Sequence, residues 1–182
     1  MNCKLIAIAL LCVSLLSGSS LLAQGATQAV RGAAAGLQQS VEDSQKPLTA
    51  GPADSKETKE PGKIDQNAER EFKTTKSGLK YRILRKSEGR KPLATDKVEV
   101  HYKGWLDNLT IFDSSYREGK TIAFGLNQVI KGWTEGVQLM GEGEMIELLI
   151  PPQLGYGVRG TPGGPIPPNA QLHFVIELIA IK

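Results

Sequence analysis

Apolar and polar residues alternate in three stretches of the chain after about residue 75, at residues 79–83, 98–102 and 172–178. A period of two with one apolar face predicts half-buried strands of an antiparallel sheet whose other face is in solvent. The apolar stretches 121–126 and 144–150 are two further expected strands. The second half of the chain therefore reads as mostly β-structure.

One segment between these strands has helical spacing instead. Trp133, Val137 and Met140 stand at positions i, i+4 and i+7. A helix of about two turns is marginally stable alone, so it must pack on another element. The simplest architecture is an α+β domain, in which a curved antiparallel sheet wraps around one short helix.

The N-terminal segment, residues 1–25, predicts a secretory signal peptide. Lys4 precedes an apolar run over residues 5–16, and small residues follow it. The run is shorter than the roughly 20 residues that span a membrane. We therefore expect an exported protein, periplasmic or extracellular, with no stable membrane span after cleavage; an uncleaved anchor is the alternative. Both cysteines, Cys3 and Cys12, lie in this segment.

Residues 26–74 are predicted to be a flexible, mostly disordered linker, and residues 75–182 to form the folded domain. Between residues 42 and 64 the chain is rich in charged residues, Pro, Gly and Ser, with few large apolar groups. Such a composition does not bury enough apolar surface to offset the entropy lost on ordering.

Several chemistries are absent from the sequence. A net charge of +3 with 23% charged residues is too balanced to indicate a nucleic-acid partner. His101 and His173 both fall on polar strand faces, which predicts surface residues, and neither has a ligand partner at metal spacing. No hydrolytic triad or paired carboxylates can be argued. We expect no metal and no cofactor.

The stretch GYGVRG contains Gly155, Gly157 and Gly160 in the spacing of a dinucleotide-binding loop. That loop must open a helix, because the helix N-terminus binds the pyrophosphate. Prolines follow Gly160 at a density that no helix tolerates. The stretch is therefore expected to be a long loop with a different function, although a dinucleotide-binding protein remains a rival interpretation.

Aromatic and branched apolar residues gather near the expected turns, around a single acidic side chain, Asp113. They could be ordinary core residues. They could also form a small apolar cup with Trp133 as its floor and Tyr102, Asp113 and Tyr156 at its rim. Such a cup suits small apolar ligands and proline rings.

Six motifs carry a resemblance to a known family. They are VHYKG (100–104), FDSS (112–115), VIKGW (129–133), EGV (135–137), PPQLGYG (151–157) and GGPIPPNAQLHFVIEL (163–178). In order and spacing they resemble the FKBP-type peptidyl-prolyl cis-trans isomerases, from about residue 75 to the C-terminus. The lead-in TTKSGLKY and the GGPIPPN loop are most similar to bacterial secreted members, including the macrophage infectivity potentiator group.

The resemblance implies an FKBP-like fold and a peptidyl-prolyl cis-trans isomerase that accelerates X-Pro rotation during folding of exported proteins, without a covalent intermediate. It implies that residues 155–168 form a flap over the cup. Asp113, Tyr156 and Tyr102 are the implied catalytic residues, and the Ile130 N–H and the Tyr156 hydroxyl are implied to hold substrate carbonyls. The implied substrate-binding residues are Phe112, Ile122, Phe124, Val129, Ile130, Trp133, Ile166 and Phe174.

Ile122 stands where the family commonly has an aromatic residue. The implied partners are proline-containing polypeptides, with macrolide ligands of the family as a further class. Residues 26–70 look too short for the helical dimerisation domain of the macrophage infectivity potentiator group, so we expect a monomer. The alternative function is a chaperone module that grips proline segments with little isomerase activity.

Overall fold

Two ten-residue strands, β3 (Lys97–Leu106) and β7 (Leu172–Ile181), form the centre of the sheet. They pair antiparallel from Val98 opposite Ile181 to Leu106 opposite Leu172. The computed structural model describes residues 47–182, which form one unit. The predicted signal peptide and residues 26–46 of the predicted linker lie outside the described residues.

The remaining strands extend the sheet on both sides of this pair. The strand order is β1-β2-β6-β7-β3-β4, with β5 also paired to β3, and every pairing is antiparallel. Register shifts in the β2–β6, β3–β4 and β3–β7 pairings mark β-bulges, which increase twist and bend the sheet. The bounds are β1 (Lys73–Thr74), β2 (Lys80–Arg85), β4 (Ile111–Ser114), β5 (Ile122–Gly125) and β6 (Met145–Ile150).

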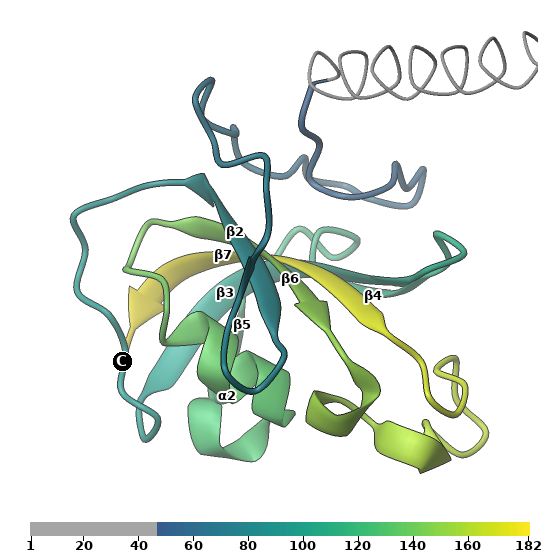
Figure 1. The fold of residues 1–182 in the computed structure, drawn as a ribbon. Coiled ribbons are helices and arrows are strands. Elements are labelled where there is room, and N and C mark those ends of the chain that lie inside the picture. Colours follow the sequence, from purple (N-terminus) through teal and green to yellow (C-terminus); the bar gives the residue numbers. More distant parts are fainter. Residues whose placement is uncertain (1–46) are drawn as a thin grey trace, which may run out of the picture. The chain divides into compact units, whose positions relative to one another are not determined.

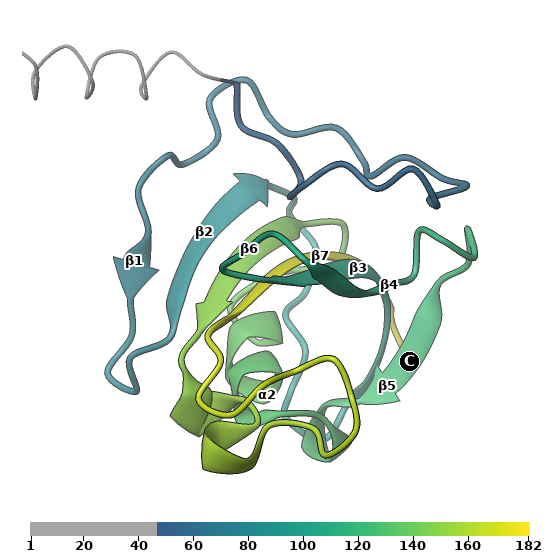
Figure 2. The same cartoon turned by 90° about the vertical axis from the view of Figure 1, so that its right-hand side faces the viewer.

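The helix α2 (Lys131–Val137) lies on the concave side of the curved sheet (Figures 1 and 2). Two glycines let it approach β6 closely. A Cβ on Gly132 would lie 2.5 Å from Ile150, and one on Gly136 would lie 2.6 Å from Leu148. The expected α+β architecture is confirmed, and so is the expected helix, although Met140 lies beyond its last residue.

The main core fills the space between α2 and the concave face. It takes alternate residues of β3, among them Val98, Val100 and Tyr102, as the period of two predicts. Trp133 and Val137 of the helix face them. The short 3₁₀ helices η1 (Leu126–Gln128), η2 (Pro152–Leu154) and η3 (Gly157–Arg159) lie in the connections at the edge of this core.

The convex face of the sheet is also covered. Residues 47–66, which we call the strap, pass over it on the side opposite α2 (dark blue in Figures 1 and 2). Leu48, Ala50 and Ile64 of the strap pack on a second apolar cluster, which contains Trp105 and Val175. No helix among residues 47–182 is both long and apolar enough to cross a membrane.

The strap differs from the sequence expectation, which assigns residues 26–74 to a linker. Its composition is poor in apolar groups, but its partners lie elsewhere in the chain. The Glu57 carboxylate pairs with Lys103, and Gly62 N–H donates to Glu177 at 2.8 Å. The composition of a segment indicates how much apolar surface it can bury, but it does not indicate which polar partners a distant strand offers.

His101 differs from expectation for the same reason. The sequence places it on a solvated face, but the strap and Tyr116 leave it only 2% exposed. Its Nε2 lies 2.7 Å from Lys59 Nζ and its Nδ1 lies 3.0 Å from Ser115 Oγ. An ammonium can only donate, so Nε2 accepts and the ring is neutral. His173 fits expectation better, because it is only partly buried and contacts Asp107 at 2.7 Å.

The turn between β3 and β4 contains a strained residue. Leu109 has a φ of 65° and is 64% exposed. The left-handed region costs an ordinary residue about 1–2 kcal/mol, and asparagine tolerates it better. We expect Leu109→Asn to raise the free energy of unfolding by about 0.5–1 kcal/mol in urea denaturation. Leu93→Asn is the matched control, since Leu93 is 66% exposed and is not among the positive-φ residues. An equal gain in both variants would contradict the prediction.

His101 gives the fold a pH dependence. Burial lowers the pKa of His101 from its usual 6.5, and the charge of Lys59 lowers it further, against smaller opposite effects of Glu177 and Glu99. Below pH 6.5 the unfolded chain binds a proton that the folded chain does not. The free energy of unfolding should therefore fall as the pH drops from 6.5 toward the lower folded-state pKa.

Urea denaturation of wild type and His101→Gln between pH 7.5 and 5.0 measures this effect. In the variant, the free energy of unfolding should lack the decrease that begins at pH 6.5 in the wild type. Both proteins contain the same carboxyl groups, so the difference between the two pH profiles reports mainly on His101. Parallel pH profiles would show that His101 does not contribute.

Candidate functional site

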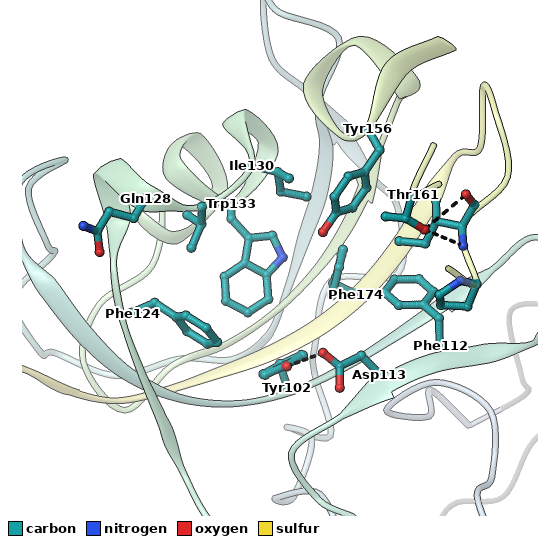
Figure 3. A pocket seen from close by; sticks show the side chains of 13 residues that line it. Tyr102, Phe112, Asp113, Phe124, Gln128, Ile130, Trp133, Tyr156, Thr161 and Phe174 are labelled. Atoms are coloured by element: carbon teal, nitrogen blue, oxygen red, sulfur yellow. Dashed lines mark hydrogen bonds between the residues drawn. The ribbon is translucent and has the colours of Figure 1, made fainter. Parts of the chain in front are cut away.

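A cavity of about 660 Å³ opens between α2, the concave face of the sheet and the connection from β6 to β7. Figure 3 shows the side chains around it. Most are aromatic or branched apolar groups, with a few polar atoms at the rim. The lining residues are Tyr102, Phe112, Asp113, Phe124, Gln128, Val129, Ile130, Trp133, Tyr156, Thr161, Pro165, Ile166 and Phe174. We call this set the cup.

Trp133 of α2 forms the floor of the cup. Three rings meet its indole edge-to-face, with centroid distances of 5.1 Å to Tyr102, 5.6 Å to Phe124 and 5.3 Å to Phe174. Edge-to-face contacts favour one fixed arrangement of rings, so the floor is rigid. Among residues 47–182, the Trp133 indole N–H has no hydrogen-bond partner, although it is buried.

Two consecutive residues of β4 face the cup, which regular alternation would forbid. The register with β3 shifts between Gly104, opposite Asp113, and Trp105, opposite Ile111, so Phe112 is the extra residue of a bulge. The bulge directs Phe112 onto Phe174, with centroids 5.5 Å apart, and also directs Asp113 to the rim. Gly104 makes room, since a Cβ there would lie 2.6 Å from both rings.

Asp113 is the one acidic group of the cup. Its Oδ2 accepts a hydrogen bond of 2.5 Å from the Tyr102 hydroxyl (Figure 3). Burial raises the pKa of Tyr102, and the bond to Asp113 raises it further. Burial and the Asp113 charge also raise the pKa of Tyr156. Both phenols therefore stay protonated at neutral pH and remain hydrogen-bond donors.

The stretch 155–168 closes one side of the cup, and we call it the flap. No helix follows Gly160, as the sequence predicts, so the geometry of a dinucleotide-binding loop is absent from this part of the described chain. Thr161 fixes the flap internally, because Ile166 N–H donates to its hydroxyl at 3.1 Å and its own N–H donates to Ile166 O at 2.9 Å. The Tyr156 hydroxyl points into the cavity (Figure 3).

The structure brings ten of the eleven predicted site residues together in the cup. Ile122 is the exception: it pairs with Val100 in β5, is 37% exposed and does not line the cavity. The sequence analysis missed Gln128, Thr161 and Pro165. Thr161 and Pro165 lie in the flap sequence, and Gln128 directly precedes a recognised motif. Their position next to predicted site residues could therefore have indicated that they line the cup.

The cup offers binding surface rather than reactive groups. Its lining contains no His, Cys, Ser or Lys, and its few polar side chains, such as Asp113, Tyr156 and Thr161, lie among apolar groups. Residues 47–182 hold no group of three or more His, Cys, Asp or Glu side chains placed to bind a metal ion. The arrangement can hold an apolar ring over Trp133 and donate hydrogen bonds from its rim.

Comparison with known proteins identifies the family to which the chain belongs. A family model described as FKBP-type peptidyl-prolyl cis-trans isomerase matches residues 88–179. The chain belongs to this FKBP-type family. The sequence resemblance to the family is thereby confirmed. Nine of the ten predicted residues that line the cup lie within the six motifs, and Phe124 is the exception.

Curated relatives place the chain among particular FKBP-type proteins. It is 50% identical over 117 residues to the isomerase FkpA of Aeromonas hydrophila, covering 64% of this chain and 43% of that protein. It is 54% identical over 107 residues to the macrophage infectivity potentiator of Trypanosoma cruzi, covering 58% of this chain and 54% of that protein. The aligned part thus spans about half the length of these relatives.

A solved structure agrees with the FKBP-like fold. The crystal structure of FkpA from Escherichia coli matches with a TM-score of 0.59 and 44% identity, over 63% of this chain and 53% of that chain. The expected fold class is confirmed.

The close approach at Gly104 gives a test of the aromatic wall. We expect Gly104→Ala to lower the free energy of unfolding by about 1–3 kcal/mol, because two rings must move. In a Phe112→Leu background one clash is relieved, and the same change should cost less. Urea denaturation of the four proteins measures both costs. An equal cost in both backgrounds would mean that the rings do not set the constraint.

Proposed function

We propose that this protein is a peptidyl-prolyl cis-trans isomerase that acts on X-Pro bonds of exported polypeptides. The observation that carries the proposal is the cup itself: a rigid aromatic floor at Trp133 and a rim of hydrogen-bond donors, with no His, Cys, Ser or Lys in the lining. Membership of the FKBP-type family supports it. The relatives FkpA and Mip are named as isomerases of this class.

Rotation about an X-Pro bond needs no covalent chemistry. Its barrier of about 18–20 kcal/mol arises because rotation breaks amide resonance. An enzyme need only bind the twisted amide more tightly than the planar one. A twisted amide carries less charge on its oxygen, so it loses less than the planar form when an apolar site removes water. Every tenfold of acceleration corresponds to about 1.4 kcal/mol of such preference.

Each side of the cup has a role in this mechanism. The proline ring lies on Trp133, within walls made by the remaining apolar lining residues. The Tyr156 hydroxyl and the Ile130 N–H hold substrate carbonyls on either side of the rotating bond. Asp113 fixes the Tyr102 hydroxyl and sets the electrostatic field near the carbonyl that rotates. Ile166, only 5% exposed, closes the flap side.

The proposal extends to the protein's surroundings. The N-terminal sequence predicts export, so the substrates are unfolded chains in the periplasm or outside the cell, where slow proline isomerisation limits folding. Macrolide ligands of the family are a further class that fits the apolar cup. We propose a monomer, since the sequence offers too little apolar surface before residue 70 for a dimerisation domain.

Two substitutions test the proposed roles. Asp113→Ala should lower kcat/KM about 10- to 100-fold, because it removes a charged hydrogen-bond partner from the rim. Tyr156→Phe should lower it about 2- to 10-fold through loss of one neutral donor. The measurement is cis-to-trans exchange in a Leu-Pro peptide, with thermal unfolding to show that each variant is folded.

Asp107→Ala and Tyr81→Phe are the matched controls, because neither residue lines the cup. Both should keep wild-type kcat/KM. If the wild type binds the peptide without accelerating the exchange, the proposed isomerase function is wrong and the protein is a module that holds proline segments. Wild-type turnover in folded Asp113→Ala would remove Asp113 from the mechanism.

A further inference from the structure

The strand that carries Asp113 is weakly held within the sheet. β4 has four residues, lies at the end of the strand order and pairs only with β3. The bulge at Phe112 removes regular pairing from its middle. Within the sheet, only β3 therefore supports the Asp113 carboxylate beside Tyr102, and contacts from outside the sheet bear directly on its position.

A carboxylate of the strap holds the C-terminal end of β4 from the convex side. The Ser114 hydroxyl donates to Glu57 Oε1 at 2.8 Å, and Lys103 Nζ lies 2.9 Å from Glu57 Oε2. The side chains of Lys103 and Glu57 are only 3% and 7% exposed. Lys103 also donates to Pro52 O at 3.0 Å. Glu57 thus joins the last residue of β4 to the strand beside it.

The strap also holds the turn after β4. Arg117 pairs with Asp54 at 2.7 Å and reaches back to Ile111 O at 3.4 Å, at the start of the strand. The N–H groups of Thr58 and Lys59 donate to Tyr116 O at 3.0 and 3.2 Å. Both ends of β4 are therefore tied to strap residues 54–59. We call these contacts the strap clamp.

We propose that Glu57 is a positioning residue for the isomerase reaction, which acts through Ser114 and Lys103 to hold β4 so that Asp113 and Phe112 face the cup. The proposal rests on the isomerase activity proposed above. Glu57 lies outside the stretch 88–179 that the family model matches, and on the opposite face of the sheet from the cup.

The chemistry of the clamp explains why it fixes geometry. A buried ion pair is costly to desolvate and adds little net stability unless its geometry is well satisfied. Here both carboxylate oxygens and the ammonium have defined partners, so the arrangement has few alternatives. Ser114 follows Asp113 directly, so a displacement of its hydroxyl moves the Asp113 backbone and lengthens the bond to Tyr102.

The kinetic test uses the full chain with substitutions at Glu57. Glu57→Ala should lower kcat/KM at least five-fold at a temperature where thermal unfolding shows it to be folded. Glu60→Ala, an exposed carboxylate of the same strap, should leave kcat/KM unchanged. Ser114→Ala breaks the contact between Glu57 and β4, together with the bond that Ser114 Oγ accepts from Tyr116 N–H at 3.3 Å, and keeps the ion pair. It should lower kcat/KM two- to three-fold even if Glu57→Ala folds poorly. Glu57→Asp should recover part of the loss.

A double-mutant cycle separates positioning from general destabilisation. If Glu57 acts through Asp113, then Glu57→Ala should change kcat/KM less than two-fold in an Asp113→Ala background. The same loss in both backgrounds would overturn the proposal, and so would wild-type kcat/KM in Glu57→Ala.

Amide hydrogen exchange tests the clamp without relying on activity. The Ser115 N–H, which donates to Tyr102 O at 2.9 Å, should exchange at least ten-fold faster in Glu57→Ala and at the wild-type rate in Glu60→Ala. Unchanged exchange would overturn the clamp itself. Faster exchange in Glu57→Ala, together with no isomerase activity in the wild-type protein, would leave the clamp standing and would refute both the proposed function and the positioning role that rests on it.

Discussion

The alternation of β3 between two faces organises the whole molecule. Tyr102 and Gly104 face the helix and supply the cup, while Lys103 and Trp105 face the strap. A shift of one residue in the long register with β7 would exchange these two sets. One strand therefore determines both the position of the site and the surface on which the N-terminal segment rests.

The cup departs from that regularity at one place. Regular pairing would send only one of Phe112 and Asp113 to the concave side, and the bulge sends both. The bulged arrangement requires a glycine at position 104, because a side chain on Gly104 would occupy the space of Phe112 and Phe174. The site thus combines an apolar wall and a carboxylate from adjacent residues of an edge strand, which a regular strand could not provide.

The sequence predicted what depends on local pattern. Period-two alternation located β2, β3 and β7, apolar stretches located β5 and β6, and helical spacing located α2. The four-residue β4 escaped, because a bulged strand has no alternation to read. The strap escaped because its contacts, such as Glu57 with Lys103, join residues far apart in the chain. Ile122 was placed in the cup by analogy with an aromatic position, and its shorter side chain at the exposed end of β5 does not reach the cavity.

A catalyst of bond rotation needs a rigid site more than a reactive one. Its effect comes from preferring one amide geometry over another, so small displacements of the rim reduce it. The interlocked rings around Trp133, the close approach at Gly104 and the hydrogen bonds within the flap all restrict motion. Two hydrogen bonds complete the restraint on β4. Tyr102 holds the Asp113 carboxylate from the concave side, and Glu57 holds the Ser114 hydroxyl from the convex side. An edge strand held from both faces can present a carboxylate as steadily as a central strand could.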